Sequence, residues 1–225
     1  MADLILALDT PDPTSALSLL DRVPQVTWVK LGSVLFTQAG PGLIVELRRR
    51  GLRIFLDLKW HDIPNTVRGA VERARGLGVD MVSVHTLGGR AMMAAAKGAA
   101  GTALIVVGVT VLTSHDEVEL SSLLGREAEP QVEVTRLAEL ARQAGIDGVV
   151  SSPLEVARLR AALGHSAVLV TPGIRAAASA KDDQARIATA GSAVRDGANF
   201  LVVGRPVLDA PDPYRAWEDL RAECS

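Results

Sequence analysis

The chain has 225 residues, in which 24 Lys and Arg face 26 Asp and Glu for a formal net charge of −2. This balance, with no basic run beyond Arg48-Arg49-Arg50, argues against nucleic-acid binding. No apolar run reaches the ~18 residues needed to cross a bilayer, and the N-terminus lacks the regions of a signal peptide. The only cysteine, Cys224, excludes an intrachain disulfide and fits a reducing compartment. We therefore expect a cytoplasmic protein with neither nucleic acid nor membrane as a partner.

Short apolar segments rich in β-branched residues recur along the chain with helical patterns between them. The predicted strands are residues 4–9, 28–32, 54–59, 81–86, 103–112, 148–152, 167–171 and 200–203. Helices are predicted up to Arg22, over 36–50 with a break or late start at Gly40-Pro41-Gly42, over 64–77, 88–98, 132–143, 153–163 and 184–195, and up to Trp217. Residues 176–183 show no apolar periodicity.

This alternation of strands and helices fixes the expected fold class. Parallel strands joined by crossover helices are the arrangement that such an order demands. Eight repeats in so short a chain favour a (β/α)8 barrel over an open sheet. The first turn, residues 9–13, also lacks the Gly-x-Gly-x-x-Gly pattern of an open dinucleotide-binding sheet. We predict an α/β protein with a single (β/α)8 barrel domain over residues 1–225.

The stretch 54–66 concentrates charged residues at the end of an apolar strand. Asp57 and Lys59 stand two residues apart, so a regular strand would point both to one face. Asp62 follows, and Pro64 is typical of the first turn of a helix. A salt bridge between the strand and its loop is the simplest interpretation. Because an unpaired buried charge costs several kcal/mol, two carboxylates flanking one lysine favour a functional array.

Charged and polar residues also end the other predicted strands, where a barrel of this class places its active site. These residues are Asp9, Lys30, Asp57 with Lys59, His85, Thr113, Ser152, Arg175 and Arg205. Charges of both signs around one cavity make a preorganised electrostatic site. Glycine and arginine recur after the last two strands, as Gly173 with Arg175 and Gly204 with Arg205. Backbone N–H groups and guanidinium groups there indicate a phosphate site.

Metal and nucleophilic chemistry have little support. The four histidines include no pair at metal-ligand spacing, and there is no Gly-x-Ser-x-Gly. We interpret His85 as a packing or hydrogen-bonding residue at the barrel mouth, and His115 and His165 as loop residues. We predict no metal and no cofactor.

Sequence blocks from the first strand to the last resemble the bacterial orotidine 5′-phosphate decarboxylases. The blocks are Leu6-Ala-Leu-Asp9, Val29-Lys30-Leu-Gly32, Phe36-Thr-Gln-Ala-Gly40-Pro41, Asp57-Leu-Lys59-Trp-His-Asp62-Ile-Pro-Asn-Thr66, Val84-His85, Val111-Leu-Thr113-Ser114, Thr171-Pro-Gly-Ile-Arg175, Asp183-Gln184 and Val203-Gly204-Arg205-Pro206. The block from Asp57 to Thr66 is highly specific. One departure is Ala176-Ala177, where many members have a proline and a glycine nearby.

The resemblance implies a carboxy-lyase that converts orotidine 5′-monophosphate to UMP, the last step of de novo pyrimidine synthesis, as a homodimer without cofactor or metal. It makes Lys59 the proton donor to C6 of the pyrimidine and Asp57 the neighbour of the departing carboxylate. It implies that Lys30 holds Asp57 and contacts the ribose, while Asp62 joins the catalytic set from the neighbouring subunit. The other implied substrate contacts are Asp9 at a ribose hydroxyl, Thr113 at the pyrimidine, Thr66 reaching across the dimer, Ile63, Pro172, and the phosphate ligands Arg175, Gln184, Gly204 and Arg205, with 176–183 as a lid.

Two alternatives remain open at this point. The 3-keto-gulonate 6-phosphate decarboxylases and hexulose-phosphate synthases share the barrel and the Asp-x-Lys-x-x-Asp core. They hold Mg²⁺ partly through an acidic residue at the end of strand two, where this chain has Lys30. A non-catalytic phosphosugar-binding barrel would bind UMP without turnover.

Overall fold

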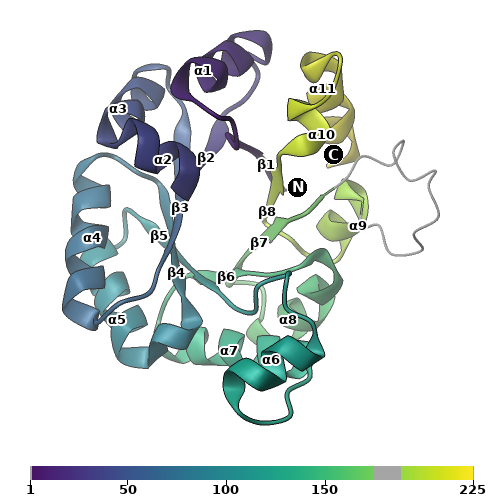
Figure 1. Ribbon diagram of the computed structural model, residues 1–225. Coiled ribbons are helices and arrows are strands. Elements are labelled where there is room, and N and C mark those ends of the chain that lie inside the picture. The colour runs from purple at the N-terminus through teal and green to yellow at the C-terminus, as the bar shows by residue number, and fades with distance from the viewer. Residues whose placement is uncertain (1, 175–188, 225) are drawn as a thin grey trace.

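Eight parallel strands close into a barrel in the order β1 to β8, with β8 paired to β1. The structure, a computed structural model, describes residues 2–174 and 189–224. Figure 1 shows the strands as an inner ring and the helices as an outer one. The strands are β1 Asp3–Ala7, β2 Trp28–Gly32, β3 Arg53–Trp60, β4 Met81–His85, β5 Ile105–Val109, β6 Gly148–Val150, β7 Val168–Pro172 and β8 Phe200–Val203. The predicted (β/α)8 barrel is confirmed.

Helices follow the strands around the ring. They are α1 Pro13–Arg22, α2 Ser33–Ala39, α3 Pro41–Arg49, α4 Pro64–Gly76, α5 Gly89–Ala100, α6 Glu117–Leu124, α7 Pro130–Gln143, α8 Val156–Leu163, α9 Ala190–Arg195, α10 Arg205–Leu208 and α11 Pro213–Glu223. Proline opens α1, α3, α4, α7 and α11, where its missing N–H costs nothing. Within the described ranges, every helix is too short or too polar to span a bilayer.

Several element boundaries differ from the predictions. The predicted break at Gly40-Pro41-Gly42 is confirmed, because Gly40 adopts φ 61° and Pro41 then begins α3, but α2 starts at Ser33, earlier than the predicted residue 36. The polar segment after β5 contains α6, which no apolar pattern predicted because only Leu120 of this helix is buried. The last helix, α11, runs beyond Trp217 to Glu223, and β5 is shorter than the apolar run over 103–112. Residues 184–188 of the helix predicted over 184–195 lie outside the described residues.

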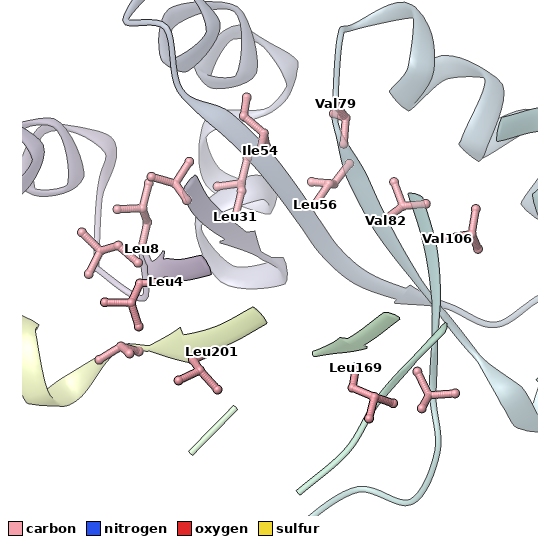
Figure 2. Close-up of a cluster of buried hydrophobic side chains, with 14 of the residues drawn as sticks. Leu4, Leu8, Leu31, Ile54, Leu56, Val79, Val82, Val106, Leu169 and Leu201 are labelled. Atoms are coloured by element: carbon pink, nitrogen blue, oxygen red, sulfur yellow. The ribbon is translucent and has the colours of Figure 1, made fainter. Parts of the chain in front are cut away.

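Two apolar cores fill the structure. The interior of the barrel holds Ile5, Ala7, Trp28, Phe55, Met81, Val107, Val170 and Val202. A larger core, between the strands and the surrounding helices, is built mainly from Leu, Val, Ile and Ala. Figure 2 shows part of it, with Leu31, Leu56 and Val82 on neighbouring strands. Because the interior is packed, the cavity for a ligand lies above it, at the carboxyl ends of the strands.

The opposite end of the barrel is held by a repeated arrangement. The residue before β4, β6 and β8 accepts a hydrogen bond from the backbone N–H near the start of the preceding strand and also contacts a helix cation. The three sets are Asp80 with Ile54 N–H (2.8 Å) and Arg48 (3.1 Å), Asp147 with Val106 N–H (2.8 Å) and Lys97 (2.7 Å), and Asn199 with Leu169 N–H (2.8 Å) and Arg160 (2.7 Å). These contacts satisfy buried backbone donors, so this end serves stability.

Candidate active site

A cavity of about 1670 Å³ opens at the carboxyl ends of the strands. Its floor is the barrel's interior core, at Ala7, Phe55 and Val202. Its wall contains the following predicted site residues: Asp9, Lys30, Asp57, Lys59, Pro172, Gly204 and Arg205. Residues from β1, β2, β3, β7 and β8 are thus brought to one site.

Four charged side chains form an alternating row along one wall. The Lys30 ammonium lies 2.9 Å from an Asp9 oxygen and 3.8 Å from Asp57 Oδ2. The Lys59 ammonium lies 2.9 Å from the same Asp57 oxygen. Asp57 is only 8% exposed, so these two cations are needed to stabilise its buried charge. The Lys59 side chain is 42% exposed and faces the cavity. Two carboxylates and two ammonium groups leave the row without net charge.

The strand that carries Asp57 and Lys59 is irregular where it meets β4. Leu56 pairs with Val82 and Trp60 with Val84, so three residues of β3 face one residue of β4. Lys59 has φ 50°, and among the described residues no other non-glycine residue has positive φ. The predicted proximity of the two side chains is present, but regular strand alternation does not produce it. A bulge with one residue in the left-handed region does.

Ser83 on β4 is a buried polar contact that the sequence analysis missed. Its hydroxyl donates to Asp57 Oδ1 (2.7 Å) and accepts the Lys59 backbone N–H (2.9 Å). The side chain is fully buried. One signal could have indicated this contact. A serine interrupts the apolar run Met-Val-Ser-Val, at an inward position of the strand next to Asp57.

The predicted phosphate site is described in part. Gly204 precedes α10, and exposed Arg205 begins it. Pro172 ends β7 and is followed by Gly173, whose φ of 81° suits glycine. Arg175, Gln184 and the predicted lid over 176–183 lie outside the described residues.

Four predicted site residues, Asp62 of the catalytic set and three substrate contacts, lie away from the cavity lining. Asp62, Ile63 and Thr66 are exposed where β3 leads into α4, and Thr113 is exposed four residues after β5. The Asp62 carboxylate accepts the N–H of Ile63 at 2.6 Å. Within the described part of the chain it pairs with no cation.

Two other strand-end residues have local structural contacts. Ser152 forms a capping box with Glu155, so its hydroxyl organises a short 3₁₀ helix at Pro153–Glu155. His85 accepts the Leu87 N–H at Nδ1 (3.3 Å) and stacks on His61 with ring centroids 5.5 Å apart. Burial, with nearby His61 and Lys59, lowers the pKa of His85 to about 4. In the described ranges, no cluster of three or more His, Cys, Asp or Glu could hold a metal ion.

Comparisons with known proteins agree with this geometry. The family described as "Orotidine 5′-phosphate decarboxylase / HUMPS family" matches residues 2–220. A relative from Nitrosospira multiformis named orotidine 5′-phosphate decarboxylase is 50% identical over 212 residues, 93% of this chain and 88% of its own. One of the same name from Opitutus terrae is 49% identical over 225 residues, 98% of this chain and 97% of its own. The crystal structure of orotidine 5′-phosphate decarboxylase from Lactobacillus acidophilus superposes with a TM-score of 0.90 at 35% identity, covering all of both chains. The chain belongs to the orotidine 5′-phosphate decarboxylase / HUMPS family.

Proposed function

We propose that this chain is a carboxy-lyase that decarboxylates orotidine 5′-monophosphate to UMP. The row Asp9, Lys30, Asp57 and Lys59 at the barrel mouth is the observation that carries the proposal. Relatives about half identical to this chain over nearly its whole length carry the name of this enzyme. The family also contains other decarboxylase chemistry, so the charges of the site have to identify the reaction.

Lys59 stabilises the carbanion intermediate and donates the proton that completes the reaction. Loss of CO2 leaves a carbanion at C6, and the pyrimidine ring offers no electron sink. An ammonium at ~4 Å from this carbon contributes about 4 kcal/mol at an effective dielectric near 20. Lys59 reaches into the cavity on an irregular strand end, and its ammonium then supplies the proton to C6.

Asp57 and Lys30 prepare the site for this step. Asp57 is buried and held between two ammonium groups, so it stays close to the place of the substrate's carboxylate. Repulsion between the two carboxylates raises the energy of the bound substrate and disappears as CO2 leaves. Lys30 fixes Asp57 and contacts the ribose, and the Asp9 carboxylate accepts a hydrogen bond from a ribose hydroxyl.

The substrate phosphate binds at the part of the cavity where β8 leads into α10. Gly204 and Arg205 offer a backbone N–H and a guanidinium there, and Arg175 and Gln184 complete this set in the proposal. Because the phosphate is remote from the bond that breaks, its binding energy can be used to hold the pyrimidine against Lys59. Pro172, Ile63 and Thr113 complete the proposed substrate contacts.

The reaction needs neither metal nor cofactor in this proposal. In the Mg²⁺-dependent alternative an acidic residue at the end of β2 helps to hold the ion, whereas here Lys30 occupies that place and pairs with both Asp9 and Asp57. The ammonium groups of Lys30 and Lys59 would repel a Mg²⁺ ion at these carboxylates. The test is the change in pyrimidine absorbance when the protein is mixed with orotidine 5′-monophosphate in EDTA. Decarboxylation that EDTA abolishes and Mg²⁺ restores would favour the alternative, and tight UMP binding without turnover would favour a binding protein.

We also propose a homodimer in which Asp62 and Thr66 serve the partner's site. Support comes from the exposed Asp62 carboxylate and from two exposed apolar side chains, Ile63, the next residue in the chain, at 66% and Val34 in α2 at 76%. Val34 lines a second hollow of about 430 Å³ together with Asp57 and Lys59, so a partner there would approach the charged row. We propose that residues 1–225 form a single barrel domain. The single cysteine supports a cytoplasmic location.

A further inference from the structure

The pairing of β3 with β4 is interrupted where the reactive groups lie. Between the pairs Leu56–Val82 and Trp60–Val84, Ser83 alone faces Asp57, Leu58 and Lys59. A regular ladder would give the Lys59 N–H a carbonyl acceptor on β4. The bulge removes that acceptor, and a partly buried backbone N–H without a partner costs free energy.

The Ser83 hydroxyl replaces the missing ladder contact and extends it to Asp57. It accepts the Lys59 N–H at 2.9 Å and donates its own proton to Asp57 Oδ1 at 2.7 Å. The other carboxylate oxygen, Oδ2, is thereby left for the ammonium groups of Lys59 (2.9 Å) and Lys30 (3.8 Å). One buried hydroxyl thus fixes the rotation of the carboxylate and the backbone from which the Lys59 side chain departs.

We propose that Ser83 is a positioning residue for decarboxylation, which holds the Asp57 carboxylate and the left-handed backbone of Lys59 in their reactive arrangement. This inference rests on the proposed function. Among the non-glycine residues that the structure describes, only Lys59 has a positive φ. Such a conformation persists only where surrounding contacts enforce it. Without the hydroxyl, the Lys59 backbone can relax toward the extended region and the carboxylate can turn about its own axis. The ammonium would then leave the position from which it protonates C6.

The test compares Ser83→Ala with Ser83→Thr, which keeps a hydroxyl. We expect Ser83→Ala to lower kcat by about tenfold to a hundredfold, the range for a hydrogen bond to a charged group. Its KM and the Kd for UMP should stay within about threefold of wild type, because Ser83 does not line the cavity. Ser83→Thr should recover most of the lost kcat. The Lys59 amide hydrogen should exchange faster in Ser83→Ala than in wild type or Ser83→Thr.

Thr86→Val is the matched control, because it removes another buried hydroxyl next to β4, one that donates to the Val109 carbonyl at 2.8 Å. It should lower thermal stability without a selective loss of kcat. Where Ser83→Ala does not fold, Ser83→Cys keeps the shape with a weak hydrogen-bonding group and should show the same loss.

The inference is wrong if a folded Ser83→Ala or Ser83→Cys protein keeps kcat within about threefold of wild type. It is equally wrong if Ser83→Thr is as slow as Ser83→Ala, or if Thr86→Val loses as much kcat. Absence of decarboxylation by the wild-type protein would instead contradict the proposed function, so the two failures are distinguishable.

Discussion

The Lys59 ammonium lies 2.9 Å from the Asp57 carboxylate, and both residues belong to the irregular end of β3. The carboxylate is buried and the ammonium is partly exposed to the cavity. The exposed partner of such a pair can turn toward a ligand while the buried one stays fixed. This difference matches the two proposed roles, proton donor for Lys59 and fixed neighbour of the leaving group for Asp57.

Lys59→Ala should abolish decarboxylation while the barrel remains folded. The carbanion loses its adjacent cation, about 4 kcal/mol, which corresponds to a factor of roughly 10³ in kcat. Steady-state kinetics measures the loss, and circular dichroism and UMP binding verify the fold. A folded variant with more than about a thousandth of wild-type kcat would mean that another group protonates C6.

Arg205→Ala should weaken binding of UMP by about 1.5–3 kcal/mol, the range for a hydrogen bond to a charged group. Arg205 lines the cavity beside Gly204, at the start of α10. Binding of uridine, which lacks the phosphate, should hardly change. Calorimetric titration with both ligands checks this, and equal losses would place Arg205 outside the phosphate site.

Much of the barrel follows from patterns that the sequence displays directly. Strands such as β2 and β8 were predicted to the residue, because apolar segments buried on both faces stand out against their polar turns. The failures have local causes. The α6 helix buries only Leu120, so it has no apolar stripe, and α2 begins at Ser33, before the apolar pattern that starts at residue 36.

The sequence likewise predicted some features of the candidate site and not others. Strand-end reasoning brought Asp9, Lys30 and Arg205 to one cavity because their strands are neighbours in a closed barrel. The bulge at Lys59 was not predictable, because it is a feature of the pairing with another strand and is accompanied by a contact with the Ser83 hydroxyl on that strand. Contacts between residues far apart in sequence leave no periodicity to detect.

Asp147→Ala should destabilise the protein without changing kcat. The substitution leaves the Val106 N–H and the Lys97 ammonium without their carboxylate at the end of the barrel remote from the cavity. We expect the free energy of unfolding to fall by about 1.5–3 kcal/mol. Asp21→Ala is the control, because that exposed carboxylate pairs with Arg50 at the surface and should cost less than about 1 kcal/mol. Urea unfolding and kinetics measure both quantities, and a selective loss of kcat in Asp147→Ala would contradict the structural role.

His85 should make the stability depend on pH below neutrality. Its pKa is about 4 in the folded protein against 6.5 as the ordinary value, because burial disfavours the charged ring. Between these values the unfolded chain binds more protons than the folded one, so the free energy of unfolding falls as the pH falls. The slope contributed by this group approaches about 1.4 kcal/mol per pH unit. In urea unfolding at several pH values from 7 to 5, His85→Asn should flatten this dependence, while exposed His165→Asn should leave it unchanged. An identical slope in wild type and His85→Asn would rule out this coupling.

Mixed dimers test whether Asp62 serves the neighbouring subunit. Its carboxylate lies on the exposed turn into α4, outside the lining of its own cavity. An isologous dimer has two equivalent composite sites. If Asp62→Ala and Lys59→Ala proteins, each inactive alone, exchange subunits, one site of a mixed dimer carries both lesions and the other has wild-type Asp62 and Lys59 from different chains. Activity should therefore return, approaching about a quarter of wild type per total site for statistical exchange. Native mass spectrometry verifies the exchange, and mixed dimers that stay inactive would show that Asp62 acts in its own barrel.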